Sequence, residues 1–192
     1  RWAAFGLGSI DPPRRVGALA IPRVAVDRHF GDNPRLLDRV DGSGLFYLAE
    51  VSHDTRVWTG RPKTTVPAAG LKGRPTTREQ LSEGEPDPVR VDELAEQLPK
   101  RKWLRYEIKE GAKGPMVAEF AFIRAVAVRD GLPGPDVWVM PRRSLGETPE
   151  WKIYLCNAPR ATPHAPRVGV AGPRWPRAPG TGEGKGGGGE GG

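Results

Sequence analysis

A short apolar run that stops abruptly on an acid sets the strongest constraint on how this chain folds. Residues 24–26 are Val-Ala-Val, and Asp27 follows them directly. Their β-branched content predicts a short buried strand. The carboxyl end of that strand would present Asp27 at the edge of a sheet, where α/β proteins bind ligands and metals. A strand-end aspartate is also a common cap of a helix or turn, and the residues alone leave both roles open.

A helix is expected shortly after this acid. Either Asp32 or Asn33 caps it, and Pro34 occupies its first position, where the missing N–H of proline does no harm. The apolar residues that this helix would turn toward a core are Leu36, Leu37 and Val40. The strand and the helix together favour an α/β unit.

Between residues 45 and 156 the pattern is mainly that of antiparallel β-structure. Strands are expected at 45–51, 55–58, 103–109, 116–128, 137–140 and 151–156, and the longest of them is long enough to bend. One short helix is expected at 91–98, with Asp92 as its cap. Turns are expected at 42–44, 111–115 and 131–135, and residues 60–88 are expected to form a long polar loop.

The C-terminal part differs in composition from the rest. Six prolines between positions 159 and 179 exclude a regular helix, and residues 180–192 contain no apolar side chain. Such a Gly/Pro-rich segment has no surface to bury, and it is predicted to be a disordered tail. The chain therefore divides into residues 1–44 with the acid-bearing strand, residues 45–158 with the antiparallel strands, and the tail at 159–192.

Charge and cysteine content narrow the function classes. The chain carries 30 Lys and Arg against 23 Asp and Glu, a net charge of +7, which favours a polyanionic partner such as nucleic acid. The alternative is a protein that is simply rich in arginine. Cys156 is the single cysteine; it excludes an internal disulfide, fits a reducing compartment and is expected to be a buried structural thiol. No apolar run approaches a membrane span, so no membrane partner is expected.

The chemistry-bearing residues exclude several kinds of site. One cysteine and three scattered histidines cannot build a zinc site, and there is neither a serine nucleophile elbow nor a phosphate-binding glycine loop. His29 lies two residues after Asp27 and is either a site residue or an ordinary histidine. A strand-end carboxylate suits Mg²⁺ or Mn²⁺, although phosphodiester cleavage with two metal ions needs two or three converging carboxylates.

Five segments carry a family resemblance. Residues 24–33 combine a strand ending in Asp, an aromatic-glycine pair and a capped helix. The other four segments are 45–58 (LFYLAEVSHDTRVW), 110–115 (EGAKGP), 154–162 (YLCNAPRAT) and 174–176 (RWP). In this order they resemble the DDE-type transposases of bacterial insertion sequences, within the DDE superfamily endonuclease group of insertion sequence 701 type. The likeness extends from about residue 24 to residue 175.

The resemblance implies a fold and a set of functional residues. The fold would be α/β, a partial RNase H-like core with a mostly antiparallel β insertion. Asp27 would be the second catalytic aspartate and a ligand of Mg²⁺ or Mn²⁺ in the complete enzyme. The partner would be DNA at transposon ends, with cleavage and strand transfer in the bacterial cytoplasm and an oligomer as the form of the complete enzyme. Candidates for DNA contacts are Lys109, Lys113, Arg142, Arg143 and Arg174, and the alternative for them is plain surface charge.

The chain also departs from the family pattern. The first catalytic aspartate lies on an earlier strand in that family, whereas the first acid here is Asp11, in a proline-rich stretch where a turn is expected. The final glutamate belongs just after Arg-Trp-Pro, where this chain has Arg177 and Ala178. The expectation is a truncated fragment without nuclease activity of its own. Two further alternatives stay open, a non-catalytic basic DNA-binding module and a remnant without biochemical function.

Overall fold

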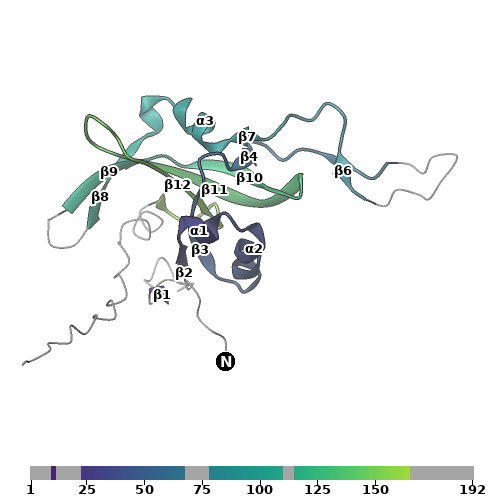
Figure 1. Ribbon diagram of the computed structural model, residues 1–192, viewed down its shortest axis with the longest axis horizontal. Helices are drawn as coiled ribbons and strands as arrows, with labels where there is room; N and C mark the ends of the chain where they lie inside the picture. Colours follow the sequence, from purple (N-terminus) through teal and green to yellow (C-terminus); the bar gives the residue numbers. More distant parts are fainter. Residues whose placement is uncertain (1–9, 12–22, 68–77, 110–114, 165–192) are drawn as a thin grey trace, which may run out of the picture.

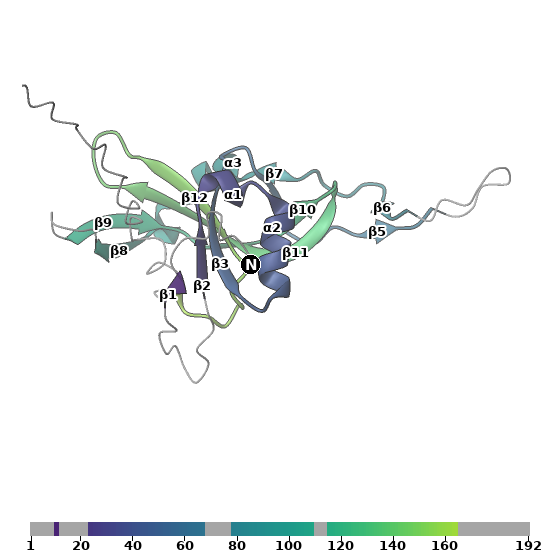
Figure 2. The ribbon, with the colours of Figure 1, turned by 60° about the horizontal axis from the view of Figure 1, so that its bottom comes forward.

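One mixed sheet of ten strands dominates the computed structural model, which describes residues 10–11, 23–67, 78–109 and 115–164 (Figure 1). The strand order is β1-β2-β3-β12-β11-β10-β4-β7; β9 also pairs with β11, and β8 pairs with β9. Two short strands, β5 and β6, form a separate ribbon at the opposite end of the molecule from β8 and β9 (Figures 1 and 2). The fold is therefore mixed α/β, mostly sheet with few helices.

The elements have the following bounds. The strands are β1 (Ile10–Asp11), β2 (Arg23–Val26), β3 (Phe46–Val51), β4 (Arg56–Trp58), β5 (Thr64–Thr65), β6 (Gln80–Leu81), β7 (Val89–Arg90), β8 (Leu104–Lys109), β9 (Pro115–Phe120), β10 (Ile123–Arg129), β11 (Leu132–Ser144) and β12 (Trp151–Cys156). The helices are α1 (Arg28–Gly31), α2 (Pro34–Gly42), α3 (Val91–Glu96) and the short 3₁₀ turn η1 (Lys100–Lys102).

The strand-acid-helix unit predicted from the sequence is confirmed. Strand β2 pairs in parallel with β3, with Val24 opposite Tyr47 and Val26 opposite Ala49. Parallel neighbours need a crossover, and α1 and α2 supply it. Asn33 is the cap of α2, since its side chain accepts a hydrogen bond from the Leu36 N–H at 3.2 Å. All other ladders of the described residues are antiparallel.

Side chains alternate between two apolar clusters on the two faces of the sheet, as the pleat requires. On β12, Ile153 and Leu155 join the larger cluster, whereas Tyr154 and Cys156 join the smaller one. The larger cluster also takes in Leu37 and Val40 of α2 and Val91 of α3, and the partly buried Leu94 of α3 packs against it. Burial of Cys156 agrees with the structural thiol expected from the sequence.

The long strand expected at 116–128 is bent, as foreseen, and broken in two. β9 pairs with residues 142–144 of β11, and β10 pairs with residues 132–139 of the same strand. At the break, the Ala121 N–H donates to the Pro141 carbonyl at 3.0 Å, which keeps both halves on β11. The β8–β9 hairpin thereby projects from one end of the sheet (Figure 2).

The prediction that Asp92 caps the helix at 91–98 was wrong. The cap position is Arg90, which makes no side-chain capping bond. The strand β7 holds the chain extended up to Arg90, and the first helical N–H groups bind the β3–β4 turn instead: Val91 donates to Thr55 at 2.9 Å and Asp92 to His53 at 3.2 Å. Asp92 lies in the first turn, where its negative charge interacts favourably with the positive end of the helix dipole.

Other boundaries also differ from expectation. The turn expected at 131–135 is confined to Asp130 and Gly131, with φ of 51° and 77°, and β11 begins at Leu132. Such a two-residue Asp-Gly link suits a tight hairpin. Residues 60–88 were expected to form a loop throughout, but they contain the two short strands β5 and β6. Asp11, expected in a turn, belongs to the short strand β1 opposite Arg23.

Some expectations lie outside the described residues, among them the C-terminal tail from 165 onward and most of the turn at 111–115. The division at residues 44 and 45 stays a prediction, and the β2–β3 ladder crosses it. Within the described ranges, no helix is long and apolar enough to span a membrane.

Candidate functional site

Asp27 stands at the carboxyl end of β2 and caps α1. Its Oδ1 accepts a hydrogen bond from the Phe30 N–H at 3.2 Å, and its side chain is exposed. Within the described part of the chain, Oδ2 has no hydrogen-bond or ion-pair partner. The structure confirms the capping role, and a role of the second oxygen as a metal ligand stays a prediction.

The aromatic-glycine pair after Asp27 fixes the position of this carboxylate. Phe30 packs against the larger apolar cluster, and Gly31 lies directly on β3. A β-carbon at position 31 would meet the Glu50 carbonyl oxygen at 1.9 Å, so only glycine allows this approach. The one-turn helix α1, which the sequence pattern did not predict, is therefore seated on the neighbouring strand.

A second carboxylate is tied to the carboxyl end of β3. Asp32 accepts from the Ser52 N–H at 2.7 Å and from the Ser52 hydroxyl at 2.5 Å, while Arg28 Nε donates to the same hydroxyl at 3.2 Å. Sequence reasoning expected Asp32 only as a possible helix cap. The bond to Ser52 joins residues that are 20 positions apart, and only the parallel pairing of β2 and β3 brings them together.

A cavity of about 460 Å³ opens beside this bond, between α1, α2, the β3–β4 turn and β10. Its polar lining side chains include Asp32, Ser52, Asp54, Arg56 and Arg129. Oxygen ligands and guanidinium groups thus gather near the carboxyl edge of the parallel strands. Yet no cluster of three or more His, Cys, Asp or Glu that could hold a metal ion occurs among the described residues.

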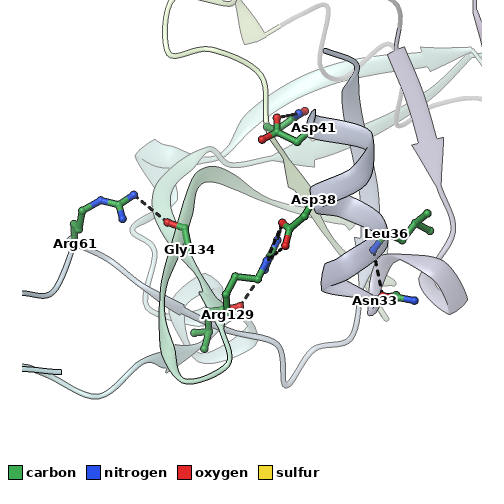
Figure 3. A network of polar contacts seen from close by, with 9 residues as sticks. Asn33, Leu36, Asp38, Asp41, Arg61, Arg129 and Gly134 are labelled. Carbon is green, nitrogen blue, oxygen red and sulfur yellow. Dashed lines mark hydrogen bonds and ion pairs between the residues drawn. The ribbon is translucent and has the colours of Figure 1, made fainter. Parts of the chain in front are cut away.

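Arg129 closes one side of the cavity by linking β10 to α2 (Figure 3). Its Nε lies 2.9 and 3.0 Å from the two carboxylate oxygens of Asp38, and its Nη1 donates to the Val128 carbonyl at 3.0 Å. Nearby, Arg61 donates to the Gly134 carbonyl at 3.0 Å (Figure 3). Arg129 therefore connects β10 to α2, and Asp38 neutralises its charge.

The residues predicted to contact DNA have different environments. Arg142 is 8 % exposed. Arg143 forms an ion pair with Glu119 at 2.6 Å and stacks on Trp103, with 4.2 Å from its guanidinium carbon to the ring centre. Lys109 is the last residue of β8, opposite Pro115. Lys113, Arg174 and the side chain of Lys109 lie outside the described residues. Contacts of all five with DNA stay predictions.

Comparison with known proteins adds the family. A family model described as DDE superfamily endonuclease matches residues 5–115, more than half of the chain. The chain belongs to the DDE superfamily endonuclease family. The match includes β2, Asp27 and β3, and three of the segments that carry the resemblance, 24–33, 45–58 and 110–115, lie inside it. No curated protein and no solved structure matches the chain.

Members of the DDE superfamily endonucleases act on DNA with divalent metal ions, and Asp27 fits the role of a ligand. It offers a hard carboxylate oxygen that is exposed and without a protein partner in the described part of the chain. Mg²⁺ keeps several waters and binds through one or two carboxylates together with substrate phosphates. The residues present therefore fit one protein ligand of such an ion.

Proposed function

We propose that this DDE superfamily endonuclease is part of a transposase of the insertion sequence 701 type, an enzyme that cleaves and joins DNA in transposition. The observation that carries the proposal is Asp27 with one unpartnered carboxylate oxygen at the exposed end of β2. Ligands and metals bind at this end of parallel strands. In the proposed assignment β2 and the crossover helices α1 and α2 belong to a partial RNase H-like core at residues 1–44, and β3 is the first strand of the β insertion.

The residues around Asp27 have separate tasks in this proposal. The Phe30 N–H holds one oxygen of Asp27, and Gly31 seats the helix on β3, so that the second oxygen is left for a metal ion. Mg²⁺ or Mn²⁺, when bound, supplies Lewis-acid stabilisation of phosphate oxygens. Asp32 accepts hydrogen bonds from Ser52, whose hydroxyl also accepts one from Arg28, so Asp32 orders this edge of the sheet.

We further propose that the 192-residue chain does not cleave DNA by itself. The family pattern has a catalytic glutamate just after Arg-Trp-Pro, and this chain has Arg177 and Ala178 at that place. A plasmid-nicking assay with Mg²⁺ or Mn²⁺ tests the proposal, and the expected result is no cleavage above a protein-free control. Nicking that disappears in the Asp27→Ala variant would contradict it and assign activity to the chain.

Metal binding at Asp27 can be measured without activity. Mn²⁺ added to isotopically labelled protein should broaden the amide signals of residues 28–31 in preference to those of α3. The Asp27→Asn variant should lose this effect, because a neutral amide is a poor ligand for a hard cation. Asp130→Asn is the matched control, since it removes an equally exposed carboxylate from a turn where asparagine is well tolerated. Equal broadening in all three proteins would count against a metal-ligand role.

The proposed partner is DNA at transposon ends, in the bacterial cytoplasm, with an oligomer as the form of the complete enzyme. A non-catalytic basic DNA-binding module is the second candidate function, supported by the net charge of +7. Both candidates require binding to duplex DNA that weakens as salt rises. Filter binding of an end-containing duplex and of a random duplex distinguishes recognition of the end from general affinity, and absence of binding to either would oppose both candidates.

A further inference from the structure

Three consecutive cations form an exposed surface that the proposed function does not yet use. The turn η1 consists of Lys100, Arg101 and Lys102, and all three side chains are exposed. None of them makes an ion pair or a side-chain hydrogen bond within the described part of the chain. The three side chains of η1 are called the η1 cations below.

The η1 cations are attached to a fixed part of the backbone. The Lys102 N–H donates to the Pro99 carbonyl at 2.9 Å, and the Trp103 N–H donates to the Lys100 carbonyl at 3.1 Å. Trp103 follows directly and is 8 % exposed. Its ring meets Trp151 edge-on at 5.3 Å and carries the Arg143 guanidinium at 4.2 Å. The turn is thus anchored to the sheet next to the β8–β9 hairpin.

Cations elsewhere on the sheet are mostly neutralised. The ion pairs are Arg61–Asp136, Arg90–Asp92, Arg105–Glu119, Arg124–Asp136, Arg129–Asp38, Arg143–Glu119 and Lys152–Glu50. The remaining exposed cations of the described residues are spread over α2 and several loops, as with Arg35, Arg39 and Lys63. Only η1 presents three unpaired charges in direct succession within the described ranges.

The nearby acids do not cancel this charge. Glu119 is held by Arg143 at 2.6 Å and by Arg105 at 3.2 Å, and the hydrogen bond from Arg143 keeps the pKa of its carboxyl below the usual value. Its single negative charge is therefore shared by two arginines. On α3, Arg90 pairs with Asp92 at 2.6 Å and approaches Glu93 at 3.7 Å. The described residues of η1 and the start of β8 carry only positive charges, on Lys100, Arg101, Lys102 and Arg105.

We propose that the η1 cations bind the phosphate backbone of duplex DNA. This inference rests on the proposed function, because it takes DNA as the partner and names the residues that meet it. Lysine and arginine side chains on a rigid turn fit phosphates without reading sequence, so the contact positions the duplex and leaves recognition of bases to other residues. Arg143 serves here as a positioning residue, since it stacks on the tryptophan that anchors the turn.

Three variants of the full chain test the inference. K100A/R101A/K102A removes the η1 cations, and R35A/R39A/K63A removes three equally exposed, unpaired cations elsewhere as a charge-matched control. K100R/R101K/K102R keeps the charge and changes the side chains. Affinity for a labelled random 20-base-pair duplex is measured between roughly 50 and 200 mM salt, the range over which phosphate contacts alter affinity strongly. Thermal melting by circular dichroism identifies any variant that fails to fold.

Each phosphate contact contributes about 0.9 to the slope of log affinity against log salt, so removal of three contacts should lower the slope by about two to three units. The control and the charge-conserving variant should keep the slope of the unaltered chain. If the slope fell equally in the alanine variant and in the control, the effect would be one of net charge, and the inference would be overturned. An unchanged slope in both variants would overturn it as well. If the unaltered chain itself shows no salt-dependent binding, the DNA partner of the proposed function fails, a result distinct from failure of η1 alone.

Discussion

The α-carbon of Gly31 lies so near the Glu50 carbonyl oxygen that an added β-carbon would stand 1.9 Å from it. The contact seats α1 on β3 and sets the place of Asp27, which begins the same turn. Sequence position 31 is therefore part of the candidate site, although its side chain is a single hydrogen atom.

Gly31→Ala should destabilise the protein by about 1–3 kcal/mol or more, because overpacking a close backbone approach forces the elements apart. Urea denaturation at neutral pH measures the change. Gly42→Ala is the control, since nothing lies within 4 Å of a β-carbon at that helical position and alanine favours the helix. Equal stability of the two variants would contradict a tight contact between α1 and β3.

Asp27→Asn should fold as well as the unaltered chain, because asparagine caps a helix as well as aspartate does. Asp27→Ala loses the bond to the Phe30 N–H and should cost about 0.5–2 kcal/mol. Thermal melts of the two variants measure this difference. The asparagine variant can then serve in metal-binding experiments without a change of fold; a loss of stability as large as that of the alanine variant would show that the charge itself holds α1.

Asn157 joins the chain after β12 to the start of β3. Its Oδ1 accepts from the Tyr47 N–H at 2.7 Å, and its Nδ2 donates to Asp41 at 2.5 Å and to the Leu45 carbonyl at 3.0 Å. Asn157→Ala should cost about 1–3 kcal/mol, since the Tyr47 N–H loses its partner. Chemical denaturation measures the cost, and a change under 0.5 kcal/mol, the usual effect of a surface substitution, would contradict this role.

Asn157→Asp separates geometry from charge at the same position. It keeps an acceptor for Tyr47 and places a second carboxylate against Asp41, so it should be less stable than the unaltered chain at neutral pH. The deficit should shrink near about pH 4, where carboxylates begin to take up protons. Adding Asp41→Asn should restore stability at neutral pH. A deficit independent of pH would point to lost packing instead of repulsion.

Glu119 gives the chain a specific dependence on acid. The hydrogen bond from Arg143 lowers the pKa of this carboxyl in the folded state below its ordinary value of 4.5. A lowered folded pKa means that the contribution to stability is complete above the unfolded pKa and is lost as the pH falls through the folded pKa. Melting temperatures of the unaltered chain and of Glu119→Gln should differ at pH 7 and converge in acid. A constant difference from neutral pH into acid would exclude this linkage.

Local signals predicted much of the fold. The Val-Ala-Val run gave β2, and Asn33 with Pro34 gave the start of α2, because capping depends on neighbours in the chain. The start of α3 was missed at Asp92, since the first N–H groups of that helix bind carbonyls of a turn some 36 residues earlier. The Asp130-Gly131 hairpin carried a readable signal, the left-handed preference of this pair, although the expected turn was wider and lay at 131–135.

The sequence predicted only the part of the candidate site that depends on a single residue and its neighbours in the chain. Asp27 follows from the end of an apolar run, whereas the Asp32–Ser52 bond depends on strand register and has no sequence spacing of its own. The ion pairs of Arg143 and Arg129 likewise depend on which strands become neighbours. Charge alone could not separate these neutralised arginines from the η1 cations. Periodicity identified strands, but only the ladder order identified partners.

The sheet passes from the β8–β9 hairpin through β9, β11, β12 and β3 to β2 without leaving hydrogen-bonded ladders. A flexible linker would let the distance between the two ends of this path vary. Hydrogen-bonded neighbouring strands keep that distance constant. A duplex bound at the hairpin end would thus lie at a fixed distance from the carboxylate of Asp27 at the end of β2. The number of strands between the two would determine which phosphate of the duplex reaches that carboxylate.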